Sequence, residues 1–175
     1  MQTGEEVWRL QHSKGFSLGC TPIAVDDKVI IATGYGGNNL VAIDPTGSGD
    51  VTNTHVLWRQ SKGMPLMSSP IHLGDLLYTV TDSGILHALS HSDGELVWRQ
   101  RLGGKFSSSP FASGDRLFVG DHDGKIIVFR AADKFEEIAH YELGEQIMAS
   151  PIPIGDDLIL RTKTAVYRFS KQTSK

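Results

Sequence analysis

The sequence has little of what marks several large classes of protein. It contains one cysteine, Cys20, so no disulfide can form within the chain. No apolar run approaches the roughly 20 residues of a membrane-spanning helix, and no membrane span is predicted. The formal net charge is −3 and the lysines are scattered. This argues against nucleic-acid binding, because phosphate-tracking proteins carry a basic stripe.

Helical periodicity and a signal peptide are also missing. No segment repeats its apolar residues at the helical spacing, so the chain is predicted to be all-β. The first residues, Met1-Gln2-Thr3-Gly4-Glu5-Glu6, are acidic and do not resemble a secretory signal. Two interpretations follow, a cytoplasmic protein or a piece of a longer chain. The 39% hydrophobic content is enough for the core of a single domain over residues 1–175.

What the sequence does contain is a repeated unit. A Thr-Pro or Ser-Pro pair marks each copy, and the prolines Pro22, Pro70, Pro110 and Pro151 are 48, 40 and 41 residues apart. Asp-Gly and Ser-Gly pairs separate short apolar runs, and these residues accept the positive φ of hairpin turns. Trp-Arg ends the units at Trp8, Trp58 and Trp98, whereas the third unit has Ile138-Ala139-His140-Tyr141 there.

A period near forty residues with four short strands per unit is typical of β-propeller blades. We expect four-stranded antiparallel blades over residues 18–60, 66–102 and 106–143, and an incomplete blade over 147–170. Residues 3–10 match the last strand of the second unit, so they are predicted to be the outer strand of a preceding blade or of the last one. The longer connection Asp44–Asn53 is expected to be a surface loop.

The sequence does not decide how many blades the complete ring contains. The unmatched outer strand and the incomplete last blade favour a fragment or half of an eight-bladed propeller. Two copies of the chain could instead form a homodimer that completes the ring, and a tight four-bladed ring is a third alternative. An unclosed ring would expose apolar blade faces until further blades or another chain covered them.

The repeat resembles that of the quinoprotein alcohol dehydrogenase-like propellers, the pyrroloquinoline quinone (PQQ) repeat family. In the second unit the resemblance is carried by Ser69-Pro70, Asp75, Leu77-Tyr78, Ser83-Gly84, Ala88-Leu89, Asp93-Gly94-Glu95 and Trp98. In the first unit it is carried by Ala42-Ile43-Asp44, Thr46-Gly47 and Trp58. The resemblance covers nearly the whole chain. It implies a bacterial protein that is periplasmic or extracellular, while the residues alone leave a cytoplasmic location open.

The resemblance implies one of two functions. Some members are non-catalytic scaffolds or binding modules, and others are dehydrogenases that hold PQQ and calcium near the ring axis. The ligand residues of those enzymes cannot be placed in this sequence, so we expect a non-catalytic scaffold without a cofactor, presenting loops of one face to a protein or small-molecule partner. The alternative is a fragment of a PQQ-dependent alcohol or sugar dehydrogenase, an oxidoreductase.

Four motifs that suggest chemistry are better explained by the blades. Asp121-His122-Asp123-Gly124 begins like a calcium loop but lacks a later acidic ligand, and it occupies the place of a hairpin turn. The seven histidines lack the spacing of a metal site. The serines at 68–69 and 107–109 have neither a nucleophile elbow nor a partner base. Trp8, Trp58 and Trp98 share one position on the outer strands and are predicted to be structural, packing between blades with their N–H groups bonded locally.

The topology of a blade places any binding site on one face of the ring. There the loops into the innermost strands meet the turns between second and third strands. The predicted loops are Lys14–Ser17, Gly63–Leu66, Gly103–Phe106 and Glu145–Met148, and the predicted partner-binding rim is Met64, Phe106, Met148, Tyr35 and His122. Methionine-rich surfaces are adaptable, which suits a partner segment. The expected partners are a protein or further blades; catalytic residues and metal ligands are not expected.

Overall fold

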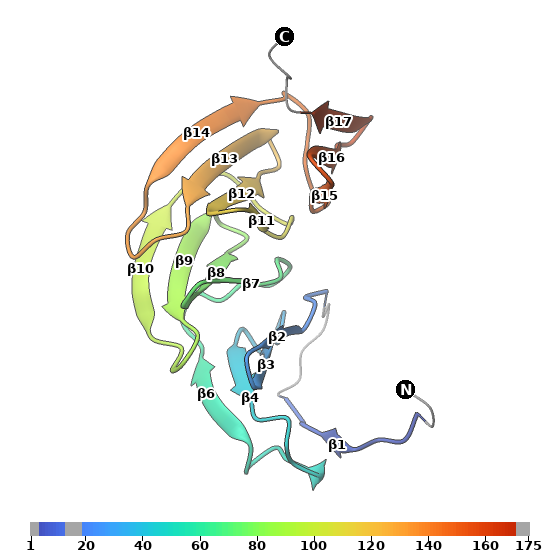
Figure 1. Cartoon of the computed structure of the whole chain (residues 1–175), viewed down its shortest axis with the longest axis vertical. Helices are drawn as coiled ribbons and strands as arrows, with labels where there is room; N and C mark the ends of the chain where they lie inside the picture. Colours follow the sequence, from blue (N-terminus) through green and yellow to red (C-terminus); the bar gives the residue numbers. More distant parts are fainter. Residues whose placement is uncertain (1–3, 13–18, 171–175) are drawn as a thin grey trace.

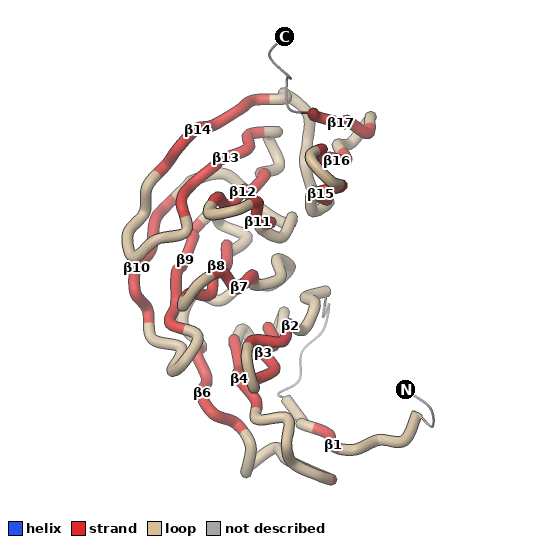
Figure 2. The backbone as a smooth tube through the Cα atoms, in the orientation of Figure 1, coloured by secondary structure: helices blue, strands red, loops and turns tan. Residues whose placement is uncertain are grey.

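A computed structural model describes residues 4–12 and 19–170. Within these residues the chain is built from strands joined by turns and loops, with no helix (Figure 2). No helix in this part of the chain is therefore long and apolar enough to cross a membrane. The all-β prediction is confirmed.

The strands form one sheet for each repeat. The first blade contains β2 (Ile23–Val25), β3 (Lys28–Ala32), β4 (Leu40–Ile43) and β6 (Val56–Gln60). The second contains β7 (Ile71–Leu73), β8 (Leu76–Val80), β9 (Ile85–Ser90) and β10 (Leu96–Arg101). The third contains β11 (Phe111–Ser113), β12 (Arg116–Gly120), β13 (Lys125–Arg130) and β14 (Glu137–Glu142). The last contains β15 (Ile152–Ile154), β16 (Asp157–Arg161) and β17 (Val166–Ser170). Neighbouring strands in every blade are antiparallel.

The blades follow one another along an open arc (Figure 1). The strands β2, β7, β11 and β15 lie on its inner side, and β6, β10 and β14 lie on its outer side (Figure 1). The core lies between blades: Tyr78 and Ala88 of the second blade pack with Leu117 and Phe129 of the third. Because a middle blade is covered on both faces, its central strands are buried throughout, as the run of buried residues in β8 shows.

A ladder of hydroxyl groups joins the inner ends of the blades. In each rung, a backbone N–H donates to the serine Oγ of the next blade, over 2.8 to 2.9 Å. The rungs are Thr21 to Ser69, Ser69 to Ser109, and Ser109 to Ser150. The serine hydroxyls before Pro70, Pro110 and Pro151 therefore have a structural role, which accounts for the repeated Ser-Pro pair.

Tryptophan joins the outer parts of the blades. The indole N–H of Trp58 donates to the carbonyl oxygen of His91 over 3.2 Å, and that of Trp98 donates to Ala132 over 2.8 Å. Each acceptor lies in the last turn of the following blade. Gly94 in that turn has a φ of 74°, and a Cβ placed there would lie 2.5 Å from the Trp58 ring. The turn therefore needs glycine both for its backbone and for the space that the indole occupies.

The N-terminal strand has a partner that the sequence did not predict. Strand β1 (Trp8–Arg9) runs parallel to β5 (Gly49–Asp50), instead of antiparallel beside the third strand of a blade. Two backbone bonds of 2.9 Å extend the pairing, from Gly49 to Val7 and from Val51 to Arg9. The connection Asp44–Asn53 is thus not merely a surface loop, because it contains β5 and the buried side chain of Val51. Residues 1–3 lie outside the described part of the chain.

The serine ladder can be tested at its middle rung. Replacing Ser109 by alanine removes the acceptor of the Ser69 N–H and leaves a partly buried donor without its partner. We expect the free energy of unfolding, measured by urea denaturation, to fall by about 1 kcal/mol. Ser113→Ala, on the exposed end of β11, is the control and should leave stability unchanged. Equal stability of the two variants would show that the rung contributes nothing.

The tryptophan contact can be tested with two glycines. Gly94 and Gly74 both have positive φ, but a Cβ at Gly74 would meet no atom within 4 Å. Each alanine variant should lose about 1 kcal/mol from backbone strain. Gly94→Ala should lose clearly more, because its methyl group displaces the indole of Trp58. Equal losses in denaturation experiments would contradict this role of the indole.

Candidate functional site: the rim of the arc

A belt of backbone hydrogen bonds brings the predicted loops and turns together on one face. The bonds are 2.8 to 3.3 Å long and alternate between loop and turn from the second blade to the fourth. They run from Phe106 N–H to Asp82 O, His122 N–H to Lys105 O, Ile147 N–H to Asp121 O, and Lys163 N–H to Gln146 O. The rim is therefore held by the backbone and not by side chains alone. The loop Lys14–Ser17 lies outside the described residues.

Each turn of the belt is closed by the side chain of its first residue. Thr81 Oγ1 accepts from the N–H of Ile85 over 3.0 Å. In the third blade Asp121 Oδ1 takes this role and accepts from Asp123 and Lys125 over 3.0 and 2.8 Å. The Asp-His-Asp-Gly motif thus forms the hairpin turn. Among the described residues no three acidic, histidine or cysteine side chains gather where a metal ion could bind.

Two of the five predicted rim residues do not lie on the surface. Met64 is 5% exposed and Phe106 is 1% exposed, and each packs in the core between blades. As surface contacts for a partner they were predicted wrongly. Met148, in contrast, is 52% exposed.

The proline marker explains which rim residues point outward. Phe106 and Ile147 both stand four positions before the proline of their unit and are buried. Met67 and Met148 stand three positions before it and are exposed. Successive residues of an extended chain point to opposite sides, so the offset from proline was a usable signal. Met67 is the rim residue that the prediction omitted.

His122 and Tyr35 have half-buried positions in their turns. His122 Nε2 lies 2.8 Å from Ser107 Oγ, so this serine does have an imidazole partner, contrary to the prediction from the sequence. A nucleophilic triad also needs a third group that orients the imidazole. In the described part of the chain no carboxylate bonds to the other ring nitrogen of His122. The pair therefore fixes the turn to the loop beneath it.

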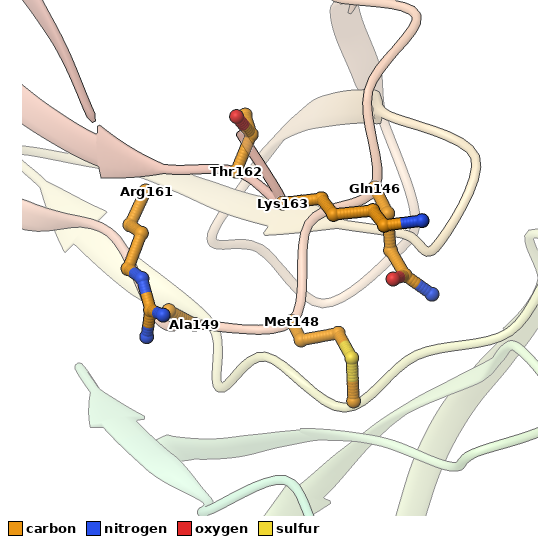
Figure 3. A pocket seen from close by; sticks show the side chains of 6 residues that line it. All are labelled: Gln146, Met148, Ala149, Arg161, Thr162 and Lys163. Carbon is orange, nitrogen blue, oxygen red and sulfur yellow. The ribbon is translucent and has the colours of Figure 1, made fainter. Parts of the chain in front are cut away.

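A shallow pocket lies at the C-terminal end of the belt (Figure 3). Its volume is about 240 Å³ and it is lined by Gln146, Met148, Ala149, Arg161, Thr162 and Lys163. The side chains of Lys163 and Gln146 lie at one side, Arg161 lies at the other, and Met148 lies below them (Figure 3). The pocket thus combines an exposed thioether with two positive charges.

Glu145 supports the wall of this pocket. Its Oε2 accepts from the hydroxyls of Thr162 and Thr164, both over 2.6 Å, and its Oε1 accepts from Tyr167 over 3.1 Å. The hydrogen bond from Thr162, followed by that from Thr164, lowers the pKa of this carboxyl group. Glu145 therefore stays ionised and holds the β16–β17 turn against the loop.

Burial shifts the pKa values of two further side chains, Cys20 and His87, in favour of their neutral forms. Burial, with a smaller effect of the Asp82 charge, raises the pKa of Cys20 to about 11. The Cys20 thiol lies 3.4 Å from the carbonyl oxygen of Ser68. Burial, with the charge of Arg99, lowers the pKa of His87. A neutral thiol is a poor nucleophile, so Cys20 is not an activated group.

Comparison with known proteins agrees with this architecture. Residues 50–135 match the family model described as outer membrane protein assembly factor BamB. No curated protein matches the chain by sequence.

Three solved structures share the fold. BamB from Moraxella catarrhalis is 16% identical, with a TM-score of 0.66 over 95% of this chain and 62% of that one. The computationally designed Ika4 protein is 12% identical, with a TM-score of 0.72 over 96% of this chain and 99% of that one. The quinohemoprotein alcohol dehydrogenase ADHIIG from Pseudomonas putida HK5 is 12% identical, with a TM-score of 0.70 over 89% of this chain and 30% of that one.

The chain thus spans less than two thirds of the BamB structure and about a third of the dehydrogenase. At these identities the structural matches establish a common fold. Together with the match over residues 50–135, they support the resemblance to PQQ-repeat propellers seen in the sequence, and the fold of the chain is that of β-propeller blades.

Proposed function

We propose that the chain is a non-catalytic propeller segment that binds a protein partner at its rim. The observation that carries this proposal is the pocket of Met148, Arg161 and Lys163 at the end of the hydrogen-bonded belt. The matched family is described as an outer membrane protein assembly factor, which fits a role in handling other proteins. A periplasmic location is part of the same proposal.

The rim would bind by presenting a surface that is already ordered. The belt fixes the loops before a partner arrives, so little conformational entropy is lost on binding. The flexible thioether of Met148 can adapt to an apolar side chain. Arg161 and Lys163 favour carboxylate groups beside it. The segment that fits best is therefore extended, with an apolar residue flanked by acidic ones.

The exposed face of the last blade indicates a second contact with another chain. On the last blade Ile152 is 58% exposed and Ile154 is 60% exposed. The residues at the same register positions in the second blade are Ile71 and Leu73, and those lie against the next blade. Exposed isoleucines on a blade face favour cover by another blade. We infer that a second copy supplies this cover when the 175-residue chain is alone in solution.

A fragment of a PQQ-dependent alcohol dehydrogenase is the alternative function, since such an enzyme shares the fold. The quinone and its calcium ion would need several oxygen ligands near the inner strands. The hydroxyls of Ser69, Ser109 and Ser150 already accept bonds within the ladder. No three acidic, histidine or cysteine side chains gather in the described part of the chain. The described residues do not fit this cofactor, and no catalytic step is assigned to them.

Rim binding can be tested by site-specific photo-cross-linking. A photoreactive amino acid at Met148 should cross-link a protein partner in cells that express the full chain. The charge reversals Arg161→Glu and Lys163→Glu should reduce the adduct about tenfold, because they repel an acidic segment. The same photoreactive group at Asp75, in a turn at the opposite end of the second blade, is the control. Equal adducts from both positions would contradict the proposal.

The second-copy inference can be tested by light scattering across a dilution series. We expect a mass of twice 19.1 kDa that persists on dilution. A replacement of both Ile152 and Ile154 by serine should produce monomers, because it removes the apolar surface that the second copy covers. A monomer of the unchanged chain, or a dimer that survives both replacements, would show that this face is not the contact.

A further inference from the structure

The junction between the third and fourth blades lacks a side chain that the two earlier junctions contain. Trp58 fills the first junction and Trp98 fills the second. The strand registers place Trp58 opposite Ala42, Trp98 opposite Ala88, and Ala139 opposite Val128. A methyl group on β14 therefore stands where the other outer strands carry an indole.

The fourth blade nevertheless keeps the apolar side chains that pack against the indole in the earlier junctions. A pair of apolar residues on the following blade packs against it in each case. The pairs are Leu77 with Leu89 in the second blade, Leu117 with Phe129 in the third and, by the same register, Leu158 with Phe169 in the fourth. Leu89 and Phe129 are 0% exposed, whereas Phe169 is 39% exposed. Phe169 is more exposed because no indole covers it and because no described strand lies on the outer side of β17.

The result is an apolar groove between β14 and β17. Its volume is about 570 Å³, and Phe118, Tyr141, Leu158 and Phe169 contribute to its walls. This volume lies in the range of sites that bind small ligands or anchoring side chains. Tyr141 and Phe169 belong to the large apolar side chains that stay exposed. The groove is therefore open to a group from outside the chain.

The acidic side chains at the groove have basic neighbours, since Lys125 is the register partner of Glu142 on the adjacent strand. Glu142 lines it directly. A second hollow shares Tyr141 and Phe169 with the groove and extends to Asp157, whose carboxylate accepts from Arg168 over 2.7 Å. The groove is therefore selected by its apolar and aromatic walls, which suit an aromatic side chain.

The edge of the last sheet adds a backbone element. In the described residues β17 pairs with β16 on one side and has no neighbour on the other. A peptide strand added at this edge would place the side chain opposite Phe169 on the same side of the sheet as Phe169. Edge pairing supplies the backbone bonds, and the groove selects the side chain.

We propose that the groove beside β17 binds an extended segment of a protein partner that carries a tryptophan. The indole enters the space that Trp58 and Trp98 occupy in the other junctions. This tryptophan lies opposite Phe169 and points into the groove, whereas its two neighbours in the segment point to the other face of the sheet. The site is separate from the rim pocket, so each proposal can fail without the other.

The test uses a fluorescently labelled peptide with the sequence of residues 94–102, Gly-Glu-Leu-Val-Trp-Arg-Gln-Arg-Leu. We expect it to bind the 175-residue chain in anisotropy titrations. Replacing its tryptophan by alanine should weaken binding by at least about tenfold. Equal binding of the two peptides would overturn the proposal.

Variants of the chain locate the bound peptide. Ala139→Trp supplies the indole from β14, so it should raise the melting temperature and weaken peptide binding about tenfold or more. Ala139→Ser keeps the groove open and should bind normally. Phe169→Ser changes an exposed wall and should also weaken binding, which keeps the test decisive if Ala139→Trp folds poorly. Met148→Ala, in the rim pocket, should bind normally.

Two results would overturn the proposal. One is unchanged peptide affinity in both Ala139→Trp and Phe169→Ser. The other is an absence of peptide binding together with self-association that is lost in Trp8→Ala, which would make the Trp8 strand of a second copy the occupant.

Discussion

The contact between successive blades is the constraint on which the structure depends. A single four-stranded sheet cannot bury both of its faces, yet β8 is buried along its whole length. Only a neighbouring blade on each side makes this possible. The serine ladder joins the inner ends of these contacts, and the indoles of Trp58 and Trp98 join the outer parts. The repeat is thus a repeat of interfaces as much as of strands.

Both proposed binding surfaces arise from this constraint. The rim is ordered because the loops Gly103–Phe106 and Glu145–Met148 each bond to the turn of their own blade and to that of the blade before. The groove exists because the interface between the third and fourth blades lacks the indole but keeps the side chains that would pack against it. The fourth blade keeps Leu158 and Phe169, while the third blade has Ala139 in place of the indole. In a junction that contains the indole this space is filled, whereas the junction without it can bind a side chain from another protein.

Much of the fold could be predicted from the sequence. The proline spacing, the Asp-Gly turns and the Trp-Arg pairs are local features, and they report the strands and the repeat directly. The opposite exposures of Phe106 and Met148 were also encoded, because the two stand at different offsets from their prolines. The pairing of Ser107 with His122 was not visible, since it joins two segments that only the folded blade brings together.

The sequence by itself determined the all-β class, the four-stranded unit and the outer-strand position of Trp58 and Trp98, because the spacing of apolar residues and turn chemistry act over a few residues. The tertiary structure alone decided which equivalent residues are covered. Ile152 and Ile71 have the same register position, but only Ile71 has a following blade against it. It also decided that Trp8–Arg9 pairs in parallel with Gly49–Asp50. Exposure and long-range pairing depend on neighbours that are distant in the chain, and a local pattern does not specify them.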